Sequence, residues 1–158
     1  MQTLSEVAGL GLAQLGTDAD ADTIRQTDIA QPLLVAAGVV AAERLLAGGP
    51  TPDVVAGHSV GEITAAAITG VLTPTEAMAF VATRGRGMAA ASNVRPTSMM
   101  AVVGGNADEV LAAIEAAGLT AANNNGPGQI VAAGTVEELG VLAADPPARA
   151  RLIQLSVA

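Results

Sequence analysis

Residues 57–61 read GHSVG, a G-x-S-x-G pattern with Ser59 at its centre. An apolar run, residues 53–56, precedes this pattern, and residues 62–69 have the composition of a helix. A strand, a sharp turn and a helix in this order form a nucleophile elbow, in which glycines permit a tight backbone that lifts the serine hydroxyl above the sheet edge. We therefore predict that Ser59 is a nucleophile and that the backbone N–H of Val60 faces an oxyanion. A Gly-rich turn whose serine merely caps the helix is the alternative.

His58 is the only imidazole in the chain and invites comparison with the base of a catalytic triad. Adjacent residues on an elbow project in different directions, so the His58 ring is poorly placed to take a proton from the Ser59 hydroxyl. We expect His58 to pack against its neighbours or to contact substrate.

Helical patterns flank the elbow on both sides. Apolar residues at three- and four-residue intervals predict a buried helix over residues 29–47, which the sequence GGP at 48–50 ends. Thr73, Pro74 and Glu76 place a hydroxyl, a proline and a carboxylate where a capping box needs them. This capping box predicts a helix from there to about residue 91.

The pattern changes after Arg95 and Pro96. Strands are predicted over residues 97–103, 119–122, 129–133 and 151–157, with helices over 107–117 and 135–144. The order β-α-β-β-α-β is typical of a ferredoxin-like domain. We therefore predict an α/β protein in two parts: residues 1–95, a partial α/β core with the elbow, and residues 96–158, a ferredoxin-like subdomain.

Composition excludes several classes of function. Seven Lys and Arg against 15 Asp and Glu give a formal charge of −8, which is unfavourable for binding nucleic acid. The absence of cysteine excludes disulfides, thiolate zinc sites and iron–sulfur clusters. The acidic residues 18–22 lack the glycine and the closing glutamate of a calcium loop, so no metal site is expected there.

We expect no secretory signal and no membrane span from the sequence. Residues 1–13 carry no basic region and include Glu6, unlike a secretory signal. The longest uncharged stretch, residues 116–136, contains NNNGPGQ and is not a membrane span. The expected location is the cytoplasm.

Four motifs together resemble one enzyme family. They are TDIAQP at 27–32, GHSVGE at 57–62, RGRGM at 84–88 and NGPGQIV at 125–131. In this order they resemble malonyl-CoA:acyl carrier protein transacylases of fatty acid synthesis, and they are similar to the acyltransferase domains of polyketide synthases. The resemblance implies an α/β-hydrolase-like large subdomain with a ferredoxin-like small one. It also implies malonyl-CoA as substrate, acyl carrier protein as partner, and no cofactor.

The resemblance implies roles for individual residues. Ser59 matches the nucleophile that malonyl-CoA acylates and that the phosphopantetheine thiol then deacylates. Arg84 matches the arginine that holds the malonyl carboxylate, a task suited to a planar guanidinium. Val60 matches malonyl-selective members, whereas methylmalonyl-selective polyketide domains often carry glutamine at this place. Without the resemblance, Arg84 reads as a surface arginine near the end of a helix.

Two family features have no counterpart in the sequence. The Pro-Gly-Gln-Gly loop that supplies a second oxyanion N–H does not precede Met1, and the segment with the catalytic histidine does not follow Ala158. We therefore expect an internal piece of the enzyme, with little or no transferase activity by itself.

Two other functions remain open. An α/β-hydrolase-type esterase shares the elbow but needs no Arg84, and a non-catalytic remnant or binding module would leave Ser59 without a covalent label. Because acyl carrier proteins are acidic, as this chain is, docking needs a local positive surface, for which Arg86 and Arg95 are the candidates.

Overall fold

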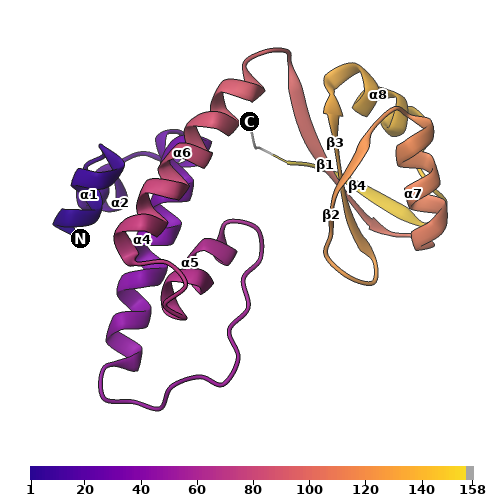
Figure 1. Ribbon diagram of the computed structural model, residues 1–158. Coiled ribbons are helices and arrows are strands. Elements are labelled where there is room, and N and C mark those ends of the chain that lie inside the picture. The colour runs from indigo at the N-terminus through magenta and orange to yellow at the C-terminus, as the bar shows by residue number, and fades with distance from the viewer. Residues whose placement is uncertain (156–158) are drawn as a thin grey trace. The chain divides into compact units, whose positions relative to one another are not determined.

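The computed structural model describes residues 1–155, which form two compact units, Met1–Ala91 and Ser92 onward (Figure 1). The expected boundary near residue 95 lies shortly after this division. As a whole the chain is an α/β protein. Each unit has a hydrophobic cluster of its own.

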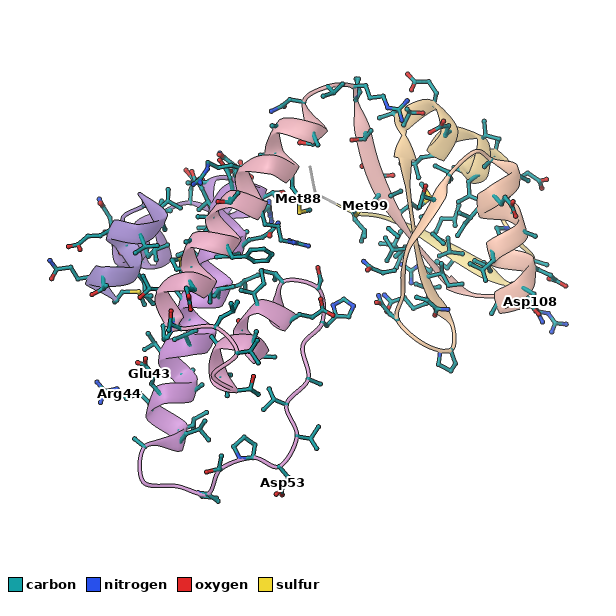
Figure 2. All side chains as sticks on the ribbon, viewed as in Figure 1. Glu43, Arg44, Asp53, Met88, Met99 and Asp108 are labelled. Carbon is teal, nitrogen blue, oxygen red and sulfur yellow. The ribbon has the colours of Figure 1, made fainter. Side chains whose placement is uncertain are left out.

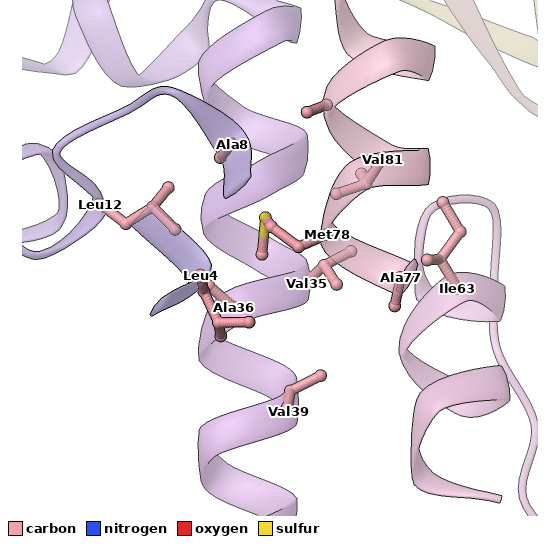
Figure 3. Close-up of a cluster of buried hydrophobic side chains, with 11 residues drawn as sticks. Leu4, Ala8, Leu12, Val35, Ala36, Val39, Ile63, Ala77, Met78 and Val81 are labelled. Atoms are coloured by element: carbon pink, nitrogen blue, oxygen red, sulfur yellow. The ribbon is translucent and has the colours of Figure 1, made fainter. Parts of the chain in front are cut away.

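The first unit consists of helices and loops. Its core gathers Val35, Met78 and Val81, each with no exposed surface, and Leu12, which is nearly as buried (Figure 3). The long helix predicted over 29–47 and the capped helix predicted from residue 73 are confirmed and contribute most of these side chains. The helices are α1 Gln2–Ala8, α2 Leu12–Asp18, α3 Ala21–Arg25, α4 Thr27–Leu46, α5 Gly61–Ile68 and α6 Pro74–Ser92.

The strand predicted over residues 53–56 is wrong. These residues form neither a strand nor a helix, and Val54 is 84% exposed. A strand needs a neighbour for its N–H and C=O groups, and residues 1–91 contain no second strand. An apolar run alone does not supply one.

Helix α4 is the central element of the first unit. By length and composition it passes a test for a membrane span, which core helices of globular proteins also pass. Val35, Ala36 and Val39 on α4 are at most 4% exposed and belong to the cluster that includes Met78 and Val81 of α6. One face of α4 therefore packs into the core of the first unit.

The second unit is a four-stranded antiparallel sheet with strand order β2-β3-β1-β4. On the central strand, Ala101 pairs with Val131 on one side and with Ile153 on the other. The predicted elements agree with those observed to within about two residues, except that residues 156 and 157 of the last strand lie outside the described residues. The elements are β1 Thr97–Gly104, α7 Ala107–Ala116, β2 Thr120–Asn124, β3 Gln129–Thr135, α8 Val136–Ala144 and β4 Ala150–Leu155.

The predicted capping box at the start of α6 is confirmed. The backbone N–H of Thr73 donates to Glu76 Oε2 at 2.8 Å, and the N–H of Glu76 donates to Thr73 Oγ1 at 3.2 Å. The Thr73 hydroxyl also donates to Glu76 Oε2 at 2.8 Å. The bonds from Thr73, first its backbone N–H and then its hydroxyl, lower the pKa of Glu76.

Thr73→Ala should raise the pKa of Glu76 toward its ordinary value and lower the free energy of unfolding by about 1 kcal/mol. A lowered carboxyl pKa contributes stability above the ordinary pKa, and this contribution disappears as the pH falls through the folded-state value. The difference in stability between the variant and the parent should therefore be largest at neutral pH and smaller in acid, where only the bond from the Glu76 N–H to the Thr73 hydroxyl still separates them. NMR titration of Glu76 and thermal unfolding at several pH values measure both effects; an unchanged Glu76 pKa contradicts the assignment.

Met78→Ala should lower the free energy of unfolding by about 2–5 kcal/mol, because it leaves a cavity in the core of the first unit. Phe80→Ala on the same helix is the matched control, since Phe80 is 57% exposed and Met78 is fully buried. Urea denaturation followed by circular dichroism measures both variants. Equal losses for the two would refute the described core.

Candidate functional site

The turn that leads into α5 has the backbone of an elbow. Ser59 has φ 53°, in the left-handed region that residues other than glycine seldom adopt. The N–H groups of Gly61, Glu62 and Ile63 donate to the carbonyls three residues before them, at 3.0, 3.1 and 3.2 Å. Strained, tightly wound backbone of this kind persists where its surroundings enforce it, commonly at functional sites. The sharp turn and helix are thus present although the preceding strand is not.

Gly57 is the residue that permits the turn. A Cβ at this position would lie 2.3 Å from the backbone nitrogen of Glu62 and 2.3 Å from the backbone carbon of Gly61. Backbone atoms at the start of a helix have no room to withdraw, so every other residue would force the turn open. Gly61 is different, since a Cβ there would meet nothing within 4 Å.

The turn exposes the groups that an acyl transfer would use. The side chain of Ser59 is exposed at the N-terminal end of α5, and its hydroxyl makes no hydrogen bond to any residue in the described range. The N–H of Val60 donates to no backbone carbonyl among residues 1–155. An accessible hydroxyl next to an uncommitted N–H at the positive end of a helix suits a nucleophile with an oxyanion donor.

His58 is exposed beside Ser59, and its carbonyl accepts the N–H of Gly61. The residue is therefore a backbone part of the turn. Its predicted contact with substrate stays a prediction.

Arg84 is half-buried on α6, and its Nη1 donates a hydrogen bond to Gln31 Oε1 on α4. Gln31 is 7% exposed, and its Nε2 donates in turn to the sulfur of Met88 at 3.2 Å. The other guanidinium N–H groups of Arg84 make no hydrogen bond within the described part of the chain. Arg84 is thus oriented by a buried amide and keeps donors for an anion.

Gln31 is a buried polar residue beside Arg84 that the sequence motifs do not single out. In the sequence it stands only as part of the motif TDIAQP. The available signal was a long amide side chain on a face of α4 that otherwise buries Pro32, Val35, Ala36 and Val39. A buried amide needs partners, so such a position indicates a specific polar contact.

Helix α5, which follows Ser59, and helix α6, which carries Arg84, both contact α4 at glycines. A Cβ on Gly38 of α4 would lie 2.7 Å from Thr64 Cγ2 of α5, and a Cβ on Gly85 of α6 would lie 3.0 Å from Asp28 Cα of α4. Gly38 lies seven residues after Gln31, which places it on the same face of α4 about 10 Å along the axis. The fold therefore brings α5 and the Arg84 contact to one face of one helix.

The two arginines considered for docking have separate surroundings. Arg86 is exposed on α6, where its Nη2 donates to Thr83 Oγ1 at 3.3 Å. Arg95 is exposed in the second unit. The pKa of Glu138 is lowered by the backbone N–H and hydroxyl of Thr135, and the charge of Arg95 adds to this effect. Both arginines remain candidates only.

The described residues 1–155 contain no group of three or more His, Asp or Glu side chains arranged to hold a metal ion. Asp20 of the acidic run caps α3, where its carboxylate accepts the N–H of Thr23 at 2.8 Å. That carboxylate therefore has a local structural role.

Comparison with known proteins points to one family. A profile described as the acyl transferase domain matches residues 2–157. The malonyl CoA-acyl carrier protein transacylase of Mycolicibacterium smegmatis is 51% identical over 156 residues, 98% of this chain and 54% of that protein. The crystal structure of MCAT from Mycobacterium tuberculosis matches with a TM-score of 0.91 and 48% identity, covering 99% of this chain and 53% of that one.

A further similar structure is a complex of a type II polyketide synthase acyl-carrier protein with its malonyl-transacylase. It matches with a TM-score of 0.83 and 29% identity, covering 99% of this chain and 53% of that chain. The chain thus spans about half the length of the relatives it matches.

Gly57→Ala should destabilise the turn and the start of α5 by about 1–3 kcal/mol, the usual cost of forcing a methyl group into closed space. Gly61→Ala is the matched control and should be neutral or slightly stabilising, because its methyl group meets nothing and alanine favours helix. Hydrogen exchange at residues 61–68 and thermal unfolding compare the two. Faster exchange in Gly61→Ala than in Gly57→Ala would contradict the described turn.

Proposed function

Because the chain belongs to the acyl transferase domain family, we propose that it carries the nucleophile and the carboxylate-binding arginine of a malonyl transferase. The reaction is transfer of malonyl from malonyl-CoA to the phosphopantetheine thiol of acyl carrier protein, in cytoplasmic fatty acid biosynthesis. The observation that carries this proposal is that an exposed elbow serine directly precedes α5, that a guanidinium oriented by Gln31 lies on α6, and that both helices contact α4.

The transfer takes place in two acyl steps. The Ser59 oxygen attacks the thioester carbonyl, the carbon–sulfur bond breaks, and coenzyme A leaves with the serine proton. The thiol of the carrier protein then attacks the serine ester and regenerates the Ser59 hydroxyl. In both steps the Val60 N–H donates to the oxygen that becomes negative.

Arg84 distinguishes a malonyl group from an acetyl group. Its anchored guanidinium meets the free carboxylate of malonyl, and a charge-assisted pair of this kind is stronger than a bond between neutral groups. Because Gln31 occupies Nη1, the remaining N–H groups are the ones available to the substrate. No cofactor takes part in this chemistry.

The base for Ser59 is the part these residues do not provide. His58 is the sole imidazole in the sequence, and it is adjacent to Ser59 on the elbow. A serine hydroxyl without a base is a poor nucleophile at neutral pH. We therefore expect little or no transferase activity from these 158 residues by themselves.

Acyl carrier protein is the proposed macromolecular partner. The complex of a relative with an acyl-carrier protein supports this assignment. Since the chain has a formal charge of −8, its overall field opposes an acidic partner, and docking depends on local cations such as Arg86 and Arg95.

The proposed function also assigns each of the two parts of the chain to a subdomain of the family. We infer that residues 96–158 are the ferredoxin-like subdomain, a view supported by the β-α-β-β-α-β order and the strand order β2-β3-β1-β4. Residues 1–95 then belong to an α/β-hydrolase-like subdomain that carries the elbow.

Incubation of the chain with malonyl-CoA and added imidazole, which replaces the missing base, should place a malonyl ester on Ser59. Ser59→Ala should abolish the ester. Arg84→Ala should weaken malonyl loading by at least about tenfold, the value of one hydrogen bond to a charged group, and should leave acetyl loading unchanged. Arg44→Ala, an exposed arginine on α4, is the control (Figure 2). Intact-mass and peptide mass spectrometry measure each ester.

Two results would favour the other functions. Full malonyl loading in Arg84→Ala indicates an esterase-like site that ignores the carboxylate. A folded chain that takes no label on Ser59 and binds malonyl-CoA no better than acetyl-CoA is a non-catalytic remnant or binding module.

A further inference from the structure

Three side chains form a short relay behind the proposed carboxylate site. Arg84 and Met88 lie one turn apart on α6, so both face Gln31 on α4. A guanidinium only donates, so the Gln31 oxygen must face Arg84, and its NH2 group is left for the sulfur of Met88, 3.2 Å away. The orientation of one buried amide therefore depends on both ends of this relay.

The relay is open to solvent at its sulfur end. Met88 is 40% exposed, whereas Met78 and Met100 are 0% and 7% exposed and Gln31 is 7% exposed. We infer from this difference that a dissolved oxidant reaches Met88 more readily than Met78 or Met100, while the Gln31 amide stays covered. Susceptibility of methionine to oxidation follows this kind of access.

We propose that Met88 is a modification site whose oxidation to the sulfoxide by a hydroperoxide releases Arg84 from Gln31 and weakens the carboxylate site. The hydroperoxide transfers its terminal oxygen to the sulfur: the O–O bond breaks, an S–O bond forms, and the proton of the terminal oxygen moves to the oxygen that leaves. The sulfur loses two electrons, and the hydroperoxide leaves as an alcohol, or as water when the oxidant is hydrogen peroxide. A methionine sulfoxide reductase reverses the change.

Geometry explains why the added oxygen disturbs the amide. An oxygen on the lone pair that faces Gln31 falls between sulfur and nitrogen, which are 3.2 Å apart. An N–H···O bond needs at least about 2.7 Å from nitrogen to oxygen, so the amide and the sulfoxide must separate. An oxygen on the other lone pair leaves a sulfur that is a poorer acceptor. The bond from the Gln31 NH2 group to Met88 is therefore broken in one case and weakened in the other.

A shift of the amide reaches Arg84 directly. Gln31 is buried, so its side chain has few alternative positions, and a turn of the amide plane withdraws Oε1 from the guanidinium. Arg84 is then no longer held by α4. Malonyl binding must order the Arg84 side chain, and this ordering costs part of the binding free energy. This inference rests on the proposed role of Arg84 in holding a malonyl carboxylate, although the structural change itself does not.

The structural change is tested by NMR on the isotope-labelled full chain treated with hydrogen peroxide. Peptide mass spectrometry should find the sulfoxide at Met88 before Met78, and the signals of the Gln31 NH2 and the Arg84 guanidinium should shift. Treatment with methionine sulfoxide reductases should restore them. Met88→Leu, which keeps the volume but removes the sulfur, should show no peroxide-dependent shift. Oxidised Met88 with unmoved Gln31 and Arg84 signals would overturn the proposal.

The effect on the site is tested by calorimetric binding of malonyl-CoA and acetyl-CoA before and after oxidation. Malonyl-CoA binding should weaken about tenfold, as for the loss of one charge-assisted hydrogen bond, while Met88→Leu is insensitive to peroxide. Malonyl-CoA binding that survives a confirmed shift of Gln31 would refute the switch. A chain that never prefers malonyl-CoA to acetyl-CoA refutes the proposed function instead, and the NMR signals still decide whether Met88 controls Gln31.

Discussion

Close packing of two helices on α4 is the constraint on which the first unit depends. Helix α5 meets α4 where Gly38 faces Thr64, and α6 meets it where Gly85 faces Asp28. A side chain at either glycine would push a site-bearing helix outward. Because Ser59 precedes α5 and Arg84 lies on α6, the same two contacts also set where Ser59 and the Arg84 guanidinium lie.

The buried amide of Gln31 adds direction to this packing. Apolar contacts between helices tolerate rotation and sliding, whereas a hydrogen bond from Arg84 to Gln31 has one geometry. Leaving a buried amide without a partner costs more free energy than a typical hydrogen bond contributes. Burial of Gln31 therefore favours the bond from Arg84 beyond the strength of the bond itself. The core of the first unit is thus apolar where it supplies stability and polar where it orients a functional side chain.

Local signals in the sequence were sufficient for much of the fold. The capping box at Thr73 and the turn at Ser59 depend on neighbours a few residues away, and both were predictable. The second unit was readable because its strands alternate with helices and pair through short connections. The strand predicted at 53–56 does not form, because a strand needs a partner strand and the apolar pattern of one segment says nothing about its partner. The bond from Arg84 to Gln31 joins side chains that are 53 positions apart, so the local sequence pattern gives little indication of it. The short helices α1 and α2, which have no side-chain caps, gave no start signal at all.

The unpaired run at 53–56 has a consequence for handling the protein. Val54 is 84% exposed, and residues 53–56 have no strand partner among the described residues, so their backbone groups are open to pairing with another chain. We therefore expect self-association to depend on protein concentration: dilute solutions favour separate molecules, and concentrated solutions favour contacts between residues 53–56 of different molecules. Light scattering across a dilution series would register the difference as a mass that rises with concentration.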